Sequence, residues 1–273
     1  METIVITGAS GFIGSSIYMM LKKNENFNLI LVSKTKSKKP FTQVNDFGEA
    51  PSGDILIHLS ENSDRNQVNS LGDISFEQSS KNLDLLLKKK YKKIIYFSSS
   101  TVYGDCGSVP YDEKSKTLYT DSYSKLKLSN EKKVIARNGI VLRVTNVIGP
   151  NMSNNNVYSD IISQLGEGES VVVRNDKPIR DFIWHEDVAY AVVKILSSNC
   201  TGIYNVGSGI GTSIRHLVKT ILKLSESDKT IVSLDKCNLN SYNVVNIEKL
   251  RSAVNWSPKH SIEKIINLME SNK

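Results

Sequence analysis

The sequence predicts an α/β protein built on a doubly wound parallel sheet, followed by a smaller C-terminal module. Short runs of Ile, Leu and Val recur through the first half of the chain, each bounded by turn residues. Helical stretches separate these runs. Strands that are covered by helices on both faces read as continuous apolar segments of this kind. After residue 150 the rhythm changes, which predicts the second module.

The expected elements follow in order along the chain. Strands of the main sheet are expected at residues 3–7, 29–33, 55–59, 94–98 and 140–144, with helices at 12–23, 76–90 and 123–138. Beyond the Asn-rich stretch 151–156, which favours turns, we expect helices at 157–165, 186–196 and 247–254, a strand at 171–174, and a strand at 204–206 in the main sheet. This organisation predicts a first domain at 1–150 and a module at 151–273, with segments around 180–206 returning to the first domain.

Charge, hydropathy and cysteine content exclude several kinds of protein. The 273-residue chain carries a formal net charge of +7, but no aromatic platform or reading helix accompanies its lysines, so we expect no nucleic-acid partner. No apolar run reaches the ~18 residues of a membrane span, and no leader is recognisable after Met1. Cys106, Cys200 and Cys237 show neither disulfide nor metal spacing. We expect a cytoplasmic protein with no metal site and no membrane partner.

Glycines connect the first expected strand to the first expected helix. Gly8, Gly11 and Gly14 lie in the segment TIVITGASGFIG. Such a turn needs glycine for its shape and for the close approach of a pyrophosphate, and the helix N-terminus behind it favours negative charge. The strand before and the helix after provide the required context. The predicted dinucleotide contacts of this loop are Gly8, Ser10, Gly11, Phe12, Ile13 and Gly14.

The end of the second expected strand favours a phosphorylated dinucleotide. An acidic residue there would bind the adenosine ribose of NAD and repel a 2′-phosphate. This chain has Ser33 and Lys34, followed by Lys36, Lys38 and Lys39. We therefore expect NADP(H) in preference to NAD(H). The alternative is a solvated lysine-rich loop with no phosphate to bind.

Motifs spread over nearly the whole chain resemble one family. They are GASGFIG at 8–14, SSSTVYG at 98–104, VLRVTNVIGP at 141–150, RDFIWHEDVA at 180–189, YNVGSG at 204–209 and WSPK at 256–259. Together they resemble the extended short-chain dehydrogenase/reductase family, the NAD-dependent epimerases and dehydratases, which includes UDP-galactose 4-epimerase and sugar-nucleotide 4-ketoreductases. Ile148 departs from the Tyr that is usual in the family. The resemblance implies a Rossmann-type fold, a nucleotide-sugar substrate and a substrate-binding role for the C-terminal module.

The family uses a tyrosine to exchange a proton with the substrate and a lysine four residues later on the same helical face. An ammonium group within ~4–6 Å favours the phenolate. The spacing occurs three times, in Tyr18 with Lys22, Tyr123 with Lys127, and Tyr190 with Lys194. Only Tyr123 begins the helix that follows the fourth expected strand, where it can face a nicotinamide at the carboxyl ends of the strands. Tyr123 and Lys127 are therefore the predicted catalytic pair.

The serine motif implies the third catalytic residue. Matched residue by residue, it gives Ser99 the hydroxyl that holds the reacting oxygen. Dehydratases of the family have Asp and Glu at the next two positions, because eliminating water needs an acid and a base. This chain has Ser100 and Thr101, so we do not expect dehydration.

The resemblance implies further contacts. Those to the cofactor come from Ser33, Lys34, Leu59, Ser60, Tyr123, Lys127, Asn146 and Val147. Those to the substrate come from Ser99, Ser100, Thr101, Asn146 and Arg180, whose guanidinium would meet the diphosphate. His58 either occupies a family histidine position or is a packed histidine. Helices 76–90 and 123–138 imply a homodimer.

Three functions remain open. The basic loop favours an NADPH-dependent reductase of a 4-keto (6-deoxy)hexose nucleotide, acting in surface-polysaccharide precursor synthesis. A nucleotide-sugar 4-epimerase uses the same three residues and regenerates its cofactor in place. A non-catalytic dinucleotide-binding sensor or interaction protein is the third, although such relatives commonly lack the Tyr or the Lys. The nucleotide base and the sugar are not specified by the sequence.

Overall fold

The main sheet is parallel and its strand order reverses once. The structure is a computed structural model that describes residues 1–35, 40–166, 168–235 and 241–271. Within these residues, seven strands are ordered β10-β6-β5-β4-β1-β2-β3. Their bounds are β1 Glu2–Thr7, β2 Phe27–Ser33, β3 Phe41–Gln43, β4 Ile55–His58, β5 Lys93–Ser99, β6 Ile140–Val144 and β10 Gly202–Val206. The reversal between β1 and β4 creates a crevice at the carboxyl ends of these strands, where ligands bind in open α/β sheets.

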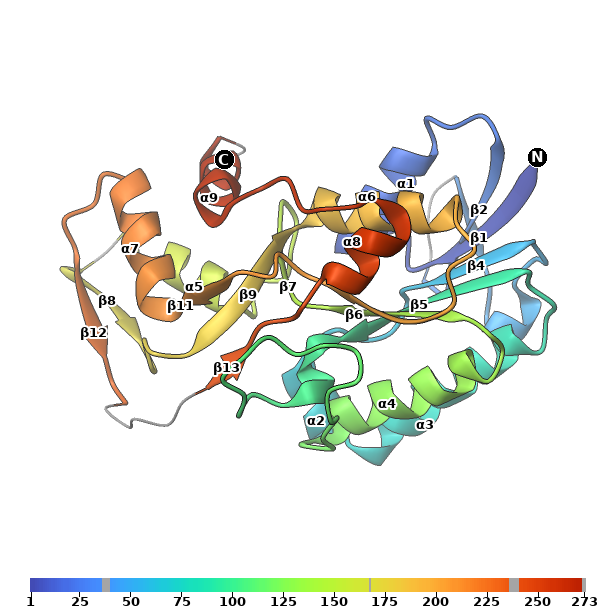
Figure 1. Cartoon of the computed structure of the whole chain (residues 1–273), viewed down its shortest axis with the longest axis horizontal. Coiled ribbons are helices and arrows are strands. Elements are labelled where there is room, and N and C mark those ends of the chain that lie inside the picture. The colour runs from blue at the N-terminus through green and yellow to red at the C-terminus, as the bar shows by residue number, and fades with distance from the viewer. Residues whose placement is uncertain (36–39, 167, 236–240, 272–273) are drawn as a thin grey trace.

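Helices cover both faces of this sheet, as Figure 1 shows. They are α1 Phe12–Leu21 and α6 His185–Leu196 on one face, and α3 Asp73–Leu87 and α4 Ser122–Ile135 on the other. Along β1, Ile4 and Ile6 belong to the core that includes α1 and α6, whereas Val5 belongs to the core that includes α3 and α4. Both faces of a strand are therefore apolar, which explains the continuous Ile, Leu and Val runs. The predicted Rossmann-type α/β fold is confirmed.

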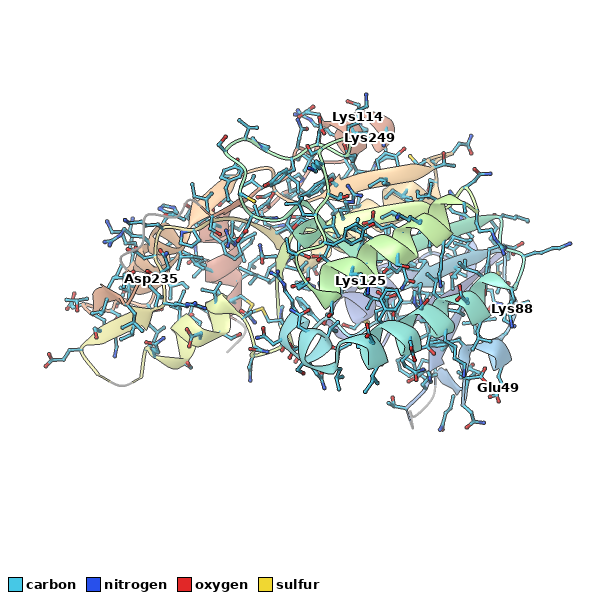
Figure 2. All side chains as sticks on the ribbon, turned by 90° about the horizontal axis from the view of Figure 1, so that it is seen from below. Glu49, Lys88, Lys114, Lys125, Asp235 and Lys249 are labelled. Atoms are coloured by element: carbon cyan, nitrogen blue, oxygen red, sulfur yellow. The ribbon has the colours of Figure 1, made fainter. Side chains whose placement is uncertain are left out.

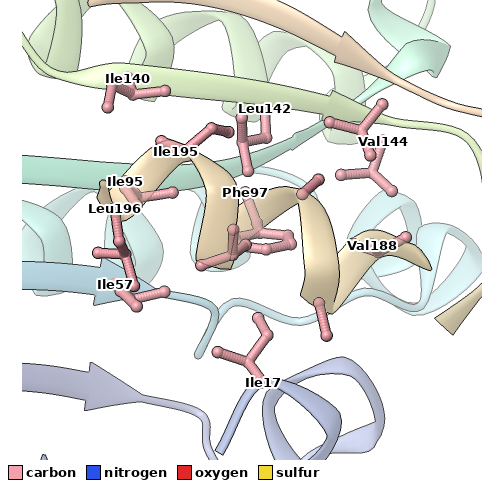
Figure 3. Packing of buried hydrophobic residues seen from close by; sticks show 14 of the residues in the cluster. Ile17, Ile57, Ile95, Phe97, Ile140, Leu142, Val144, Val188, Ile195 and Leu196 are labelled. Atoms are coloured by element: carbon pink, nitrogen blue, oxygen red, sulfur yellow. The ribbon is translucent and has the colours of Figure 1, made fainter. Parts of the chain in front are cut away.

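The core under α6 is the largest apolar cluster of the sheet. Figure 3 shows Val188, Ile195 and Leu196 of α6 in the same cluster as Ile95 and Phe97 of β5. All five are buried. This packing fixes the strand whose carboxyl end carries Ser99, so the position of that residue is set by the core rather than by a loop.

A second group of elements lies beyond the carboxyl ends of the main strands. A sheet of β11 Gly211–Ser213, β9 Ile179–Trp184 and β13 Tyr242–Asn243 also includes β7 Asn146–Ile148, and β8 Ser170–Val173 pairs with β12 Thr230–Ser233. The remaining helices are α2 Arg65–Leu71, α5 Val157–Ser163, α7 Ile214–Leu224, α8 Glu248–Val254 and α9 Ile262–Glu270, with 3-10 turns at Phe47–Glu49 and Ser100–Tyr103. Apolar side chains of α5, α7 and α9 form a separate core with those of β8 and β9, whereas Leu250 of α8 belongs to the core under α6. Figure 1 shows α5, α7, β8 and β12 at the end of the molecule away from β2.

The helices expected in the first half end earlier than the sequence suggests. The expected helix 12–23 ends at Leu21, 76–90 corresponds to Asp73–Leu87, and 123–138 ends at Ile135. The five expected strands match β1, β2, β4, β5 and β6 to within two residues. In the described ranges, no helix has both the length and the apolar character that a membrane crossing requires.

Candidate active site

The glycine turn is shaped to receive an extended anionic group. Gly8 has a φ of +77°, and a Cβ there would lie 2.8 Å from the backbone of Leu59 and Ser60. A Cβ on Gly14 would collide with the Gly8 carbonyl oxygen. Gly11 is the N-cap of α1 and makes no side-chain cap bond, so amides at this helix end remain available to an anion. The turn thus fits the pyrophosphate of a dinucleotide.

The other predicted residues of this loop divide between surface and core. Ser10 is exposed, and Ile13 packs against the core of the α1 face. Phe12 instead approaches the ring of His185 on α6, with 5.8 Å between ring centroids. Phe12 therefore links the turn to α6.

Two residues with hydroxyl side chains, Ser33 and Thr35, lie at the end of strand β2. Ser33 is buried, and its Oγ lies 3.0 Å from the hydroxyl of Thr35. Lys34 is exposed, and its ammonium lies 5.7 Å from the centre of the Phe47 ring. Lys36, Lys38 and Lys39 fall outside the described residues, as does Cys237. No carboxylate stands at Ser33 to reject a 2′-phosphate.

Tyr123 lies in the first turn of α4, which begins where the sequence provides a cap. Asp121 accepts a hydrogen bond from the Ser124 amide while Ser124 bonds back to the Asp121 amide, forming a capping box. Burial alone would raise the pKa of Asp121, but the Ser124 amide, Arg65 and Asn69 bring it down to about 2. Asn69 of α2 also accepts a hydrogen bond from the Tyr123 amide. The start of α4 is therefore fixed from two sides.

Lys127 lies one turn after Tyr123 and is buried. Its side chain is 7% exposed, and its Nζ is 5.6 Å from the centre of the Tyr123 ring. The ammonium donates to the Phe97 carbonyl on β5 at 3.0 Å and to Glu61 Oε2 at 2.6 Å. The structure thus brings the predicted pair together at the end of β5.

Glu61 was not predicted from the sequence. It follows β4 by three residues in the loop that also contains Leu59 and Ser60, and its side chain is 4% exposed. Burial raises the pKa of its carboxyl, but Lys127 and other partners outweigh burial, so the net pKa lies below the ordinary glutamate value. For Lys127, burial lowers the pKa while Glu61 raises it, and the net shift is upward. Both side chains are therefore charged at neutral pH.

His58 is a packed, neutral histidine. It is 1% exposed, and its Nδ1 lies 2.7 Å from the Thr7 hydroxyl. Burial, reinforced by Lys127 and opposed by Glu61, lowers its pKa to about 4. Its Nε2 is 4.0 Å from Glu61, too far for a hydrogen bond.

Ser99 ends β5, and its hydroxyl can still donate one hydrogen bond. It accepts hydrogen bonds from the Thr101 amide at 3.2 Å and the Thr101 hydroxyl at 3.0 Å. A hydroxyl has two acceptor sites and one proton, so the proton of Ser99 remains available to an oxygen in the crevice. Thr101 orients Ser99 in this way.

The hydroxyl of Ser100, which was predicted to contact a substrate, is bonded within the protein. It is 2% exposed, and its hydroxyl donates to Asn243 at 2.7 Å. Asn243 in turn donates to the carbonyls of Ser100 and Gly104. The Ser100 hydroxyl therefore holds the turn after β5 against β13.

The remaining predicted residues lie along β7 and β9. Asn146 is exposed and donates to the Asp181 carbonyl at 3.0 Å, while Val147 packs against the core of the α1 face. Arg180 donates to the carbonyl and hydroxyl of Ser241 and lies 3.5 Å from Asp105. About a quarter of its side chain is exposed, at 24%. A substrate anion would compete with Asp105 for this guanidinium.

A cleft of about 1020 Å³ opens beyond β7. Its walls come from the Asn-rich stretch, α5 and β8, and they include Asn66, Gly149, Tyr158, Asp160 and Arg174. Ser99, Tyr123 and Lys127 are not among its lining residues. The cleft is therefore a neighbour of the catalytic group rather than its container. Among the described side chains, no three His, Cys, Asp or Glu residues converge to hold a metal ion.

Comparison with known proteins identifies the family. Residues 4–207 match the model described as the NAD dependent epimerase/dehydratase family. A putative UDP-glucose 4-epimerase of Methanocaldococcus jannaschii is 27% identical over an alignment of 306 positions, gaps included, which covers 98% of this chain and 99% of the relative.

Solved structures share the fold over the full length. RMD from Pseudomonas aeruginosa, complexed with NADPH, has a TM-score of 0.85 at 21% identity, and the match covers 100% of both chains. UDP-N-acetylglucosamine 4-epimerase from Methanobrevibacter ruminantium M1, in complex with UDP-N-acetylmuramic acid, has a TM-score of 0.85 at 23% identity, covering 100% of this chain and 99% of that one. The predicted resemblance is confirmed, and this chain belongs to the NAD dependent epimerase/dehydratase family of extended short-chain dehydrogenases/reductases.

Proposed function

We propose that this protein reduces the 4-keto group of a nucleotide-activated (6-deoxy)hexose with NADPH. The observation that carries the proposal is the buried ammonium of Lys127 beside the Tyr123 ring, at the carboxyl end of the strand that presents Ser99. In an open α/β sheet, this edge faces a dinucleotide bound at the glycine turn. The cofactor supplies the hydride.

Side chains of the protein position the substrate and the cofactor and transfer the proton. Gly8, Gly11 and Gly14 would leave room for the pyrophosphate of the cofactor, and Lys127 would donate an N–H to its nicotinamide ribose. Ser99 donates a hydrogen bond to the keto oxygen. Tyr123 gives its phenolic proton to that oxygen as the hydride reaches carbon 4, so the ketone becomes an alcohol and a phenolate remains beside Lys127. Solvent then returns the proton.

Two observations support NADPH over NADH. Ser33 places no carboxylate at the end of β2, and the RMD structure, with the same fold, was solved with NADPH. Titration calorimetry with NADPH and NADH tests this preference, and tighter binding of NADH would overturn it.

The cleft and the relatives support a nucleotide-sugar substrate. We assign the nucleotide end to the cleft beyond β7, with Arg180 at the diphosphate, because relatives named above are UDP-sugar enzymes. Ser100 and Thr101 support reduction over dehydration because neither can serve as a carboxylate acid or base. The proposed compartment is the cytoplasm, which agrees with the free thiols of Cys106 and Cys200.

A homodimer through α3 and α4 is part of the proposal. The two helices pack against each other, and Figure 2 shows them side by side on one face of the molecule. Ile74 at the start of α3 is 71% exposed, and a shallow hollow on α3 includes Phe76 and Leu85. Light scattering during gel filtration should give twice the chain mass of 30.4 kDa.

A 4-epimerase is the second candidate, because the relative from M. jannaschii carries that name. The deciding experiment mixes the enzyme with NADPH and nucleotide-linked 4-keto sugars and follows the absorbance of the reduced cofactor. A reductase consumes one NADPH per sugar. An epimerase interconverts hydroxy sugars with no net loss of cofactor, and that result would replace the reductase assignment.

A further inference from the structure

Glu61 is a buried carboxylate whose hydrogen-bonding capacity is filled by the protein. Its Oε2 accepts from Lys127 at 2.6 Å and from the Tyr96 hydroxyl at 2.7 Å. Its Oε1 accepts from Asn130 at 2.6 Å and from the Ser79 hydroxyl at 2.8 Å. A carboxylate has about four lone-pair sites. Glu61 therefore has no free site for a substrate or a proton, which excludes a direct catalytic role.

Lys127, by contrast, has a donor to spare. An ammonium group has three N–H bonds, and Glu61 and the Phe97 carbonyl accept two of them. The third remains for the Tyr123 hydroxyl or a ligand in the crevice. The ammonium bonds to β5 and to Glu61 in the loop after β4, and Glu61 is itself held by Ser79 of α3 and Asn130 of α4.

We propose that Glu61 is the positioning residue of this site, which keeps the Lys127 ammonium charged and fixed beside Tyr123 with one N–H directed at the cofactor. Its importance for turnover rests on the proposed function. Glu61 also follows Leu59 and Ser60, whose backbone touches Gly8. One short loop therefore contacts the glycine turn at one end and holds Lys127 at the other.

The charges around Lys127 show why a counter-ion is needed. His58 on β4 is neutral. Burial and Glu61 raise the pKa of Tyr96 on β5 well above its ordinary value. Tyr123 and Glu131 lie on α4, the helix that also carries Lys127. Glu131 is already committed to Arg143, with 2.6 Å between Oε2 and Nη2. Glu61 is thus the carboxylate that bonds directly to Lys127. Without it, burial would favour the uncharged amine.

Glu61→Gln tests the proposal, with Glu131→Gln as a matched control. Each removes a buried carboxylate from an ion pair, and each site is 4% exposed. Protein carrying 13C-labelled lysine is titrated by NMR, and Lys127→Arg assigns the Lys127 signal by its loss. We expect Lys127 to titrate above the ordinary lysine pKa in the wild type and clearly below it in Glu61→Gln. In Glu131→Gln the shift should be small.

Cofactor binding provides a second readout. Calorimetry should show NADPH binding weakened roughly tenfold in Glu61→Gln at pH 7, the loss of about one hydrogen bond to a charged group. The loss should deepen as the pH rises through the lowered pKa of Lys127. Glu61→Asp keeps the charge and should restore Lys127 titration toward the wild-type value. If Glu61→Gln does not fold, the double variant Glu61→Gln/Lys127→Met, which removes both charges of the pair, should fold. Failure of the double variant as well would show that Glu61 acts through packing and would overturn the inference.

An unchanged Lys127 titration in Glu61→Gln, or an equal change in Glu131→Gln, would overturn the inference. This result is independent of the reaction. A shifted titration with weakened NADPH binding but no turnover of any nucleotide sugar would defeat the proposed function alone, and the role of Glu61 would stand.

Discussion

Two of the three Tyr-x-x-x-Lys pairs of this protein, those in α4 and α6, have almost the same local geometry. In α4 the Lys127 ammonium is 5.6 Å from the Tyr123 ring centre, and in α6 the Lys194 ammonium is 5.4 Å from that of Tyr190. The helical repeat alone produces this approach. What differs is the environment, because Lys127 is held by Glu61 and by β5, whereas Tyr190 faces a second lysine, Lys259, at 4.6 Å. The comparison shows that the four-residue spacing brings Tyr and Lys together in either helix, whereas tertiary packing decides whether the two side chains can act together in proton transfer.

The largest expected effect comes from removing one phenol. Tyr123→Phe should lower turnover roughly 10²–10⁴-fold, the usual loss of a general acid, and leave NADPH affinity nearly intact. Tyr190→Phe removes the corresponding hydroxyl from α6 and should retain full activity. Turnover is measured as cofactor absorbance and affinity by calorimetry. Equal losses in the two variants would remove the distinction between the helices.

The second effect is on stability. Lys127→Met leaves the buried Glu61 carboxylate unpaired and should lower the free energy of unfolding by about 3–5 kcal/mol. Lys194→Met on the half-buried surface of α6 should change it by about 0.5 kcal/mol or less. Urea denaturation measures both. Adding Glu61→Gln to Lys127→Met should recover part of the loss, and a strictly additive result would contradict direct coupling.

Acid should destabilise the buried cluster next to α4 that contains His58 and Glu61. The pKa of His58 is about 4 in the folded protein against 6.5 in the unfolded chain, so the unfolded state binds more protons between these values. Stability is complete above pH 6.5 and falls toward pH 4, by about 3 kcal/mol at ~1.36 kcal/mol per pKa unit.

His58→Asn keeps a polar partner for Thr7 and should flatten the unfolding free energy over this pH range. Glu61 adds to acid lability at still lower pH, because its folded pKa lies below the ordinary value. An unchanged pH profile in His58→Asn would show that the sensitivity arises elsewhere.

The smallest effect separates two adjacent serines. Ser99→Ala should reduce kcat roughly 10–100-fold, because one hydrogen bond to the reacting oxygen, on which charge develops, is lost. Ser100→Ala should leave kcat of the folded enzyme unchanged but cost about 1–3 kcal/mol of stability, since Asn243 Oδ1 loses its buried partner. Kinetics and denaturation of both variants check this. A kcat loss confined to Ser100→Ala would reverse the assignment.

The first half of the fold could be read from the sequence because its signals are local. Continuous apolar runs identify β1, β2, β4, β5 and β6, and glycines mark the turn into α1. The sheet around β9 was not expected as such, since β7, β11 and β13 are two or three residues long and pair across large sequence distances. Segments this short have no periodicity to detect.

The sequence by itself determined the parallel sheet, the dinucleotide turn and three candidate Tyr-Lys pairs, because each depends on neighbours within a few residues. Only the tertiary structure decided that Glu61 meets Lys127 from 66 positions away, that Ser99 keeps a free proton, and that the Ser100 hydroxyl is taken by Asn243. These outcomes depend on which buried polar groups satisfy one another, and that is settled only when distant strands and helices have packed.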